Sequence, residues 1–140
     1  MIPQTAKFFD DPVIDYAILP TFKLAREAKK DLKVVLTGEG GDELFGGYGR
    51  YRSSVRNFFF KKKPFQKGVF SKIEALSHYF RGWNYPIEEV RSRINDLEFS
   101  ELQKVQLLDF QEWLPNDLLV KLDRCLMAHG LEGRTPLIDT

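Results

Sequence analysis

The pattern of apolar and polar positions divides the chain into helical segments separated by turns. Over residues 20–30 the apolar residues recur at helical spacing, and Pro20 suits the first turn of a helix, where its missing N–H costs no hydrogen bond. We therefore expect a helix from Pro20 to about Lys30. Its inner side is predicted to comprise Phe22, Leu24, Ala25 and Ala28.

One strand is predicted within this helical pattern, over Lys33 to Leu36. The apolar residues that follow one another from Val34 onward are typical of the end of a buried strand. Residues 131–140 predict an extended tail. Because one strand cannot make a sheet, we expect both edges of this strand to be unpaired.

The rest of the chain predicts more helices, over residues 51–60, 69–80 and 99–110 and from Pro115 onward. Residues 82–86 are expected to form a turn. The last helix carries its apolar residues on one side and ends at Gly130, a typical C-cap residue. Those apolar residues are Leu118, Leu119, Leu122, Cys125 and Leu126. The expected fold class is α/β and mostly helical.

Composition limits the classes of function. A formal net charge of +1 gives no electrostatic reason to expect nucleic-acid or membrane binding. No apolar run approaches the roughly 20 residues that span a bilayer. Residues 1–7 lack the apolar region of a secretory signal, and the single cysteine, Cys125, suits a reducing compartment. We therefore expect a cytoplasmic protein of one domain.

The predicted strand leads into a glycine-rich, acidic segment. Six of the chain's 10 glycines fall between Gly38 and Gly49, and three acids lie among the first of them. Such a segment suits a backbone that approaches a phosphate closely and carboxylates that hold a metal. It matches neither common phosphate motif. Glu43 stands where a dinucleotide fingerprint needs its third glycine, and Gly47 stands where a P-loop needs lysine.

Residues 38–48 read Gly-Glu-Gly-Gly-Asp-Glu-Leu-Phe-Gly-Gly-Tyr, which resembles the signature of the synthetase domain of glutamine-dependent asparagine synthetases. Two other segments resemble the same family, in the same order. Upstream, Asp10-Asp11-Pro12, Asp15 and Pro20-Thr21 resemble its Asp-Glu-Pro-x-x-Asp-x-x-x-x-Pro-Thr segment. Downstream, residues 120–139 resemble its Val-Lys-x-Asp-Arg and Met-Ala-x-x-x-Glu-x-Arg-x-Pro-x-x-Asp block. The three matches span nearly the whole chain.

The resemblance implies that residues 1–140 are part of an adenine-nucleotide α-hydrolase-like (ATP-pyrophosphatase) domain with about one parallel strand. The family's glutaminase domain and its Ser-Gly-Gly-x-Asp-Ser pyrophosphate loop have no match in these residues, so we expect the chain alone to be inactive. The implied reaction uses Mg²⁺ and ATP to adenylate aspartate. Ammonia from a glutaminase domain then forms the amide. The parent enzyme could be a homodimer.

The resemblance also implies roles for residues of the glycine-rich segment. Asp42 would bind magnesium, with a helix N-cap as the alternative. Glu39 would act as a base toward the incoming amine or hold it, with a solvated loop acid as the alternative. The backbone N–H groups of Thr37 and Gly38, together with Glu39 and Gly40, would contact ATP phosphates, unless they only pair at the strand end.

Two basic residues of the last predicted helix are candidates for a pyrophosphate site. Lys121 and Arg124 are three residues apart, so they share a helix face and could neutralise pyrophosphate as it leaves. Arg124 fits the family by position and Lys121 by chemical type, so both stay candidates. The alternative is a solvated face. Three charged residues of the tail are expected to fix it through ion pairs and hydrogen bonds: Glu132, Arg134 and Asp139.

Two other functions remain compatible with these residues. The same architecture serves relatives that close β-lactams or modify peptides and glycans, in which the acceptor carboxylate and amine differ. A non-catalytic remnant could instead bind a partner through an unpaired strand edge and phenylalanine-rich helices.

Overall fold

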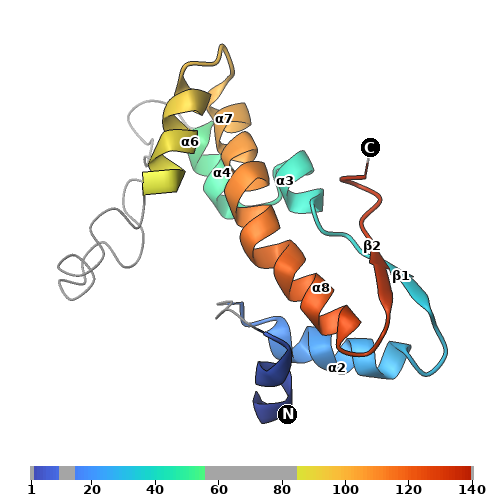
Figure 1. Cartoon of the computed structure of the whole chain (residues 1–140). Helices are drawn as coiled ribbons and strands as arrows, with labels where there is room; N and C mark the ends of the chain where they lie inside the picture. The colour runs from blue at the N-terminus through green and yellow to red at the C-terminus, as the bar shows by residue number, and fades with distance from the viewer. Residues whose placement is uncertain (1, 10–14, 56–84, 140) are drawn as a thin grey trace. The chain divides into compact units, whose positions relative to one another are not determined.

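The computed structural model describes residues 2–9, 15–55 and 85–139 (Figure 1). The chain divides into two compact units, one of residues 1–41 with 113–140 and one of residues 42–112. The helix predicted over residues 69–80 lies outside the described residues, as do residues 56–60 of the helix predicted over 51–60. Within the described ranges, no helix is both long and apolar enough to cross a bilayer.

The first unit combines helices with a two-stranded parallel sheet. Its elements are α1 (Ile2–Thr5), η1 (Ala6–Phe8), α2 (Ile18–Ala28), β1 (Val34–Leu36), the end of the helical segment η4 (Asp109–Leu119), α8 (Val120–Met127) and β2 (Glu132–Arg134). In the sheet, Val34 pairs with Glu132, Val35 with Gly133 and Leu36 with Arg134. The two strands run side by side in Figure 1. The predicted α/β, mostly helical class is confirmed.

The core of the first unit lies between α2, α8 and the sheet. Ala25 packs with Leu122, Leu126 and Leu131, and the partly buried Ala28 and Val35 join them. The predicted inner side of α2 is therefore largely confirmed. Leu24 is the exception, because it is 70% exposed. Each helical residue is rotated by about 100° from its neighbour, which turns Leu24 away from the line of Ala25.

The prediction of a single strand with two unpaired edges is wrong, because the expected tail contains β2. Gly130 adopts φ +64°, and the N–H of Leu131 donates to the Leu126 carbonyl at 3.0 Å, which is the glycine C-cap that the sequence predicts. The cap reverses the chain and lays residues 132–134 along β1. β1 is also less buried than expected, since Leu36 is 73% exposed.

The second unit is helical in its described residues. It contains most of α3 (Gly41–Phe45), α4 (Gly49–Ser54), α6 (Tyr85–Asn95), α7 (Glu101–Leu108) and the start of η4. Val90 and Ile94 of α6 pack against Leu108. Helix α6 was not predicted from the sequence, although its two buried residues are four apart, as on a helix face. Ser100 and Gln103 form a capping box that begins α7.

The prediction that Pro115 begins a new helix is wrong. The chain remains helical from Glu101 to Met127, and Pro115 lies inside η4, which has π-helical turns. In an α-helix the ring of proline collides with the carbonyl four residues earlier. Hydrogen bonds to the fifth residue back widen the turn, which explains how the helix takes up the proline without ending.

Candidate functional site

Lys121 is the centre of a charged cluster in the first unit. It lies in the first turn of α8 and is only 6% exposed. Its Nζ is 2.8 Å from Oδ2 of Asp15 and 3.4 Å from Oε1 of Glu39. Asp15 precedes α2, and Glu39 follows β1 in the glycine-rich turn. Three segments that are separate in the sequence therefore bring two carboxylates to one buried ammonium group.

Asp15 is held in place by the start of α2. Its Oδ1 accepts a hydrogen bond from the N–H of Ala17 at 2.7 Å, and its carbonyl accepts one from the N–H of Ile18. A carboxylate that accepts a hydrogen bond from the backbone N–H two residues later forms a local turn, which fixes the carboxylate in place. Asp15 belongs to the upstream segment that resembles the family, but its place in the site was not predicted from the sequence.

The pKa values of the two closest partners favour an ion pair. Burial alone would raise the pKa of Asp15, but the hydrogen bonds from Lys121 and Ala17 and the charge of Lys121 outweigh it and lower that pKa. Burial alone would lower the pKa of Lys121, but the hydrogen bond to Asp15 and the charges of Glu39 and Asp15 raise it. Both groups are therefore charged at neutral pH.

Asp117 is a third carboxylate of this cluster, and it was not predicted from the sequence. It stands four residues before Lys121, a spacing at which an acid and a base lie on the same side of a helix. Its Oδ2 is buried and has no hydrogen-bond partner. Burial, followed by the charges of Asp15 and Glu39, raises the pKa of Asp117, while Lys121 opposes the rise.

We expect Asp117→Asn to stabilise the chain by about 1 kcal/mol at pH 7, because the ionised carboxylate leaves a buried oxygen unsatisfied. Since folding raises this pKa above its ordinary value of 3.8, the folded state binds the proton more tightly. The unmodified chain thus loses stability as pH rises through the folded pKa of Asp117. The higher stability of the variant relative to the unmodified chain should vanish below pH 3.8, where Asp117 is protonated in both states. Denaturant unfolding between pH 4 and 8 measures the gain.

The matched control for this prediction is Asp123→Asn, which changes an exposed acid of the neighbouring helix α8. We expect this control to change stability little at any pH. A pH-independent effect in Asp117→Asn, or an equal effect in both variants, would contradict the prediction.

The glycine-rich turn has backbone partners of its own. The N–H of Thr37 donates to the Arg134 carbonyl at 2.8 Å, which continues the pairing of the strands beyond Leu36. This is the strand-end pairing that the sequence left as the alternative to phosphate binding. Gly40 is buried with φ +87°, and a Cβ there would lie 2.2 Å from Cγ2 of Ile138. Close packing against the tail thus explains a glycine at 40, whereas Gly38 is exposed.

Lys121 and Arg124 differ in environment, although they are three residues apart on α8. Lys121 is buried and paired with two acids, whereas Arg124 is exposed. In the tail, Nε of Arg134 forms an ion pair with Glu132 at 2.8 Å, which is one of the contacts expected among Glu132, Arg134 and Asp139. Both residues of that pair are exposed, so it contributes little to stability.

Asp42 lies in the second unit, in the first turn of the short helix α3, and is exposed. Its carbonyl accepts a hydrogen bond from the N–H of Gly47 at 2.9 Å. A Cβ at Gly47 would lie 1.9 Å from Oδ1 of Asp42, so only glycine leaves room for this carboxylate in its present position. Asp42 is inside the helix and not before it, so the N-cap alternative does not apply.

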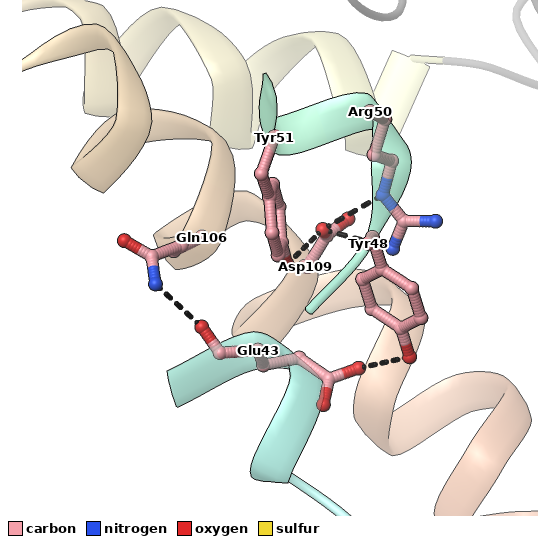
Figure 2. A network of polar contacts seen from close by, with 6 residues as sticks. All are labelled: Glu43, Tyr48, Arg50, Tyr51, Gln106 and Asp109. Atoms are coloured by element: carbon pink, nitrogen blue, oxygen red, sulfur yellow. Dashed lines mark hydrogen bonds and ion pairs between the residues drawn. The ribbon is translucent and has the colours of Figure 1, made fainter. Parts of the chain in front are cut away.

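A buried polar network holds the segment that follows Asp42 (Figure 2). The hydroxyl of Tyr48 donates to Glu43 at 2.7 Å, and Nε2 of Gln106 donates to the Glu43 carbonyl at 2.7 Å. Glu43 is only 1% exposed. Burial, followed by the hydrogen bond to Glu43, raises the pKa of Tyr48, which keeps its hydroxyl protonated. The structural role that the sequence favoured for Glu43 agrees with these contacts.

The same network continues to Asp109. Nε and Nη2 of Arg50 donate to Oδ2 of Asp109 at 3.1 and 2.9 Å, and the Tyr51 hydroxyl donates to the same oxygen (Figure 2). The guanidinium of Arg50 also lies 3.9 Å from the centre of the Tyr48 ring, a cation–π distance. None of these contacts was foreseen from the sequence.

The chemistry available to these residues is that of carboxylates and cations. In the part of the chain that the structure describes, no group of three or more His, Cys, Asp and Glu residues has the arrangement of a metal site. A lone exposed carboxylate such as Asp42 still suits Mg²⁺, which usually takes one or two carboxylates and completes its shell with water and substrate phosphates. Glu39 is a carboxylate whose position is fixed by a buried cation, so it could accept a hydrogen bond or a proton from a group bound beside it.

Comparison with known proteins places these residues in a family context. A family model described as asparagine synthase matches residues 1–140. The chain is 34% identical to a putative glutamine-hydrolyzing asparagine synthetase of Mycobacterium tuberculosis (strain ATCC 25618 / H37Rv), with 99% of this chain and 27% of that protein covered. It is 29% identical to the glutamine-hydrolyzing asparagine synthetase 1 of Bacillus subtilis (strain 168), with 99% of this chain and 28% of that protein covered. No solved structure matches the chain.

Proposed function

Because the chain belongs to the asparagine synthase family, we propose that it is part of an ATP-dependent ligase that converts the side-chain carboxylate of aspartate into an amide. The chain spans about 27% of the length of the Mycobacterium tuberculosis relative. Within that ligase it would be part of the synthetase domain, and a glutaminase domain would supply ammonia. We expect this 140-residue chain alone not to catalyse the reaction.

The observation that carries this proposal is the position of Glu39, a carboxylate between two glycines that is held by the buried ammonium group of Lys121. In the first step an oxygen of the aspartate side chain attacks the α-phosphorus of ATP, and pyrophosphate leaves. In the second step the nitrogen of ammonia attacks the acyl carbon, and AMP leaves. Glu39 would accept the proton that the nitrogen loses, as a general base close to the reacting carbon.

The remaining site residues would bind and orient ATP. Asp42 would hold Mg²⁺, which when bound offsets the charge of the phosphates. Gly38 and Gly40 would let the turn approach the nucleotide, and Thr37 would fix that turn to β2 through the Arg134 carbonyl. Arg124, exposed on α8, is the cation that we assign to pyrophosphate.

The test compares Asp42→Asn and Glu39→Gln in the full-length protein that carries this sequence. Asp42→Asn should abolish aspartate-dependent exchange between ATP and pyrophosphate. Glu39→Gln should reduce asparagine formation at least as much as adenylation, because the base acts in the second step. Asp96→Asn, an exposed acid of the second unit, is the control that should leave both steps unchanged.

Two results would contradict the proposal. Full exchange activity in Asp42→Asn would remove the metal assignment. Absence of aspartate-dependent pyrophosphate release by the unmodified full-length protein would remove aspartate as the acceptor. Pyrophosphate release measured with a panel of other carboxylic acids would then identify the acceptor that replaces it.

A further inference from the structure

We propose that Lys121 and Asp15 are positioning residues for Glu39, and that Lys121 does not bind pyrophosphate. This inference rests on the proposed function of Glu39 as the base, and it separates two cations of α8 that the sequence alone leaves equivalent. Asp15 anchors the ammonium group, and the ammonium group in turn holds Glu39. Lys121 therefore acts through Glu39 and not on the phosphates.

The charge around Lys121 is negative overall. Three carboxylates surround this one cation: Asp15 and Glu39 contact it directly, and Asp117 interacts with it electrostatically. When all four groups are ionised, their charges sum to −2. A cluster with this excess of negative charge repels pyrophosphate, whereas an ammonium group that recognises an anion needs an uncompensated charge.

The burial of Lys121 also keeps anions away from its ammonium group. Lys121 is 6% exposed, so a pyrophosphate ion would reach it only after the side chain left both of its partners. Breaking a buried ion pair is strongly unfavourable, since it leaves uncompensated charges behind. Arg124, three residues further along α8, is exposed to solvent.

Glu39 needs a contact from another segment to hold it in one position. Glu39 stands between Gly38 and Gly40, and glycine has the greatest backbone freedom of any residue. The contact of 3.4 Å between Lys121 and Glu39 provides a constraint that this backbone lacks. Asp15 makes the shorter contact of 2.8 Å and is itself fixed by the N–H of Ala17. The start of α2 is thus linked to the base through two side chains.

The kinetic test uses Lys121→Gln, Asp15→Asn and Arg124→Gln in the full-length protein. If Lys121 positions the base, then Lys121→Gln and Asp15→Asn should both slow amide formation from the preformed adenylate by about 10-fold or more. Both should leave the KM for pyrophosphate in the exchange reaction within about twofold. Arg124→Gln should instead raise the KM for pyrophosphate and have little effect on amide formation. Lys121→Arg should retain part of the rate that Lys121→Gln loses.

The result that would overturn the inference is a raised KM for pyrophosphate in Lys121→Gln together with an unchanged KM and rate in Asp15→Asn. This pattern describes a pyrophosphate cation and not a positioning residue. Asp15→Asn keeps the shape of the side chain and an oxygen that can accept from Ala17. It therefore tests the inference even if Lys121→Gln does not fold.

A second readout does not depend on activity. The titrating groups that face Lys121 are Asp15, Glu39, Asp117 and the thiol of Cys125, whose pKa burial raises to about 11. A carbon-13 NMR titration of Asp117 in the 140-residue chain should show a higher pKa in Lys121→Gln and a lower one in Glu39→Gln. If the pKa of Asp117 is the same in both variants as in the unmodified chain, the inferred charged cluster does not exist and the inference is wrong. Absence of aspartate-dependent activity in the unmodified full-length protein would instead refute the proposed function. It would not change the titration result.

Discussion

Asp109→Ala should lower the free energy of unfolding by about 3 kcal/mol, because it removes the acceptor of a partly buried ion pair and of the buried Tyr51 hydroxyl. Asp109 is 2% exposed and accepts from Arg50 and from the Tyr51 hydroxyl. Without it, the guanidinium keeps its charge beside two aromatic rings, and the Tyr51 hydroxyl loses its acceptor in a site from which water is largely excluded.

Two further variants provide comparisons for the loss of stability in Asp109→Ala. Tyr51→Phe removes one hydrogen bond and keeps the ring, so it should cost about 1–2 kcal/mol. Asp96→Asn changes an exposed acid of the same unit and should cost little. Denaturant unfolding of the three variants measures the order of their free energies of unfolding. If Asp109→Ala is no more destabilising than Asp96→Asn, the network of Figure 2 does not stabilise the second unit.

Gly40→Ala should cost about 2–4 kcal/mol, for two separate reasons. An alanine at φ +87° adopts a conformation that costs an L-residue about 1–2 kcal/mol. Its Cβ would also lie 2.2 Å from Cγ2 of Ile138, and overpacking of this kind typically costs about 1–3 kcal/mol. Either the turn that carries Glu39 or the tail that carries Ile138 must move.

Gly38→Ala is the control for this variant. It lies in the same turn, its φ is not positive, and nothing lies within 4 Å of an added Cβ. Thermal unfolding should therefore separate the two alanine variants clearly. Equal melting temperatures would show that the tail does not pack against Gly40. Gly40→Ala combined with Ile138→Ala should recover part of the loss, because the smaller side chain relieves the contact.

Local signals in the sequence were enough to locate several elements. Pro20 and the apolar spacing after it predicted α2, and Gly130 predicted the cap that ends α8. These features depend on residues within one or two turns of one another, so a local pattern contains the information. Pro115 shows the limit of such rules, since a proline that usually begins a helix lies inside η4.

The sequence by itself determined the family, the glycine-rich turn and the candidates Glu39, Asp42, Lys121 and Arg124. Only the tertiary structure decided that β2 pairs with β1 and that Asp15 and Asp117 join the site. It also separated Lys121 from Arg124, which the helical spacing had placed on one face. The physical reason is that charge compensation and burial depend on segments brought together from distant parts of the chain. A pattern read along one helix contains no information about the carboxylates that other segments place beside it.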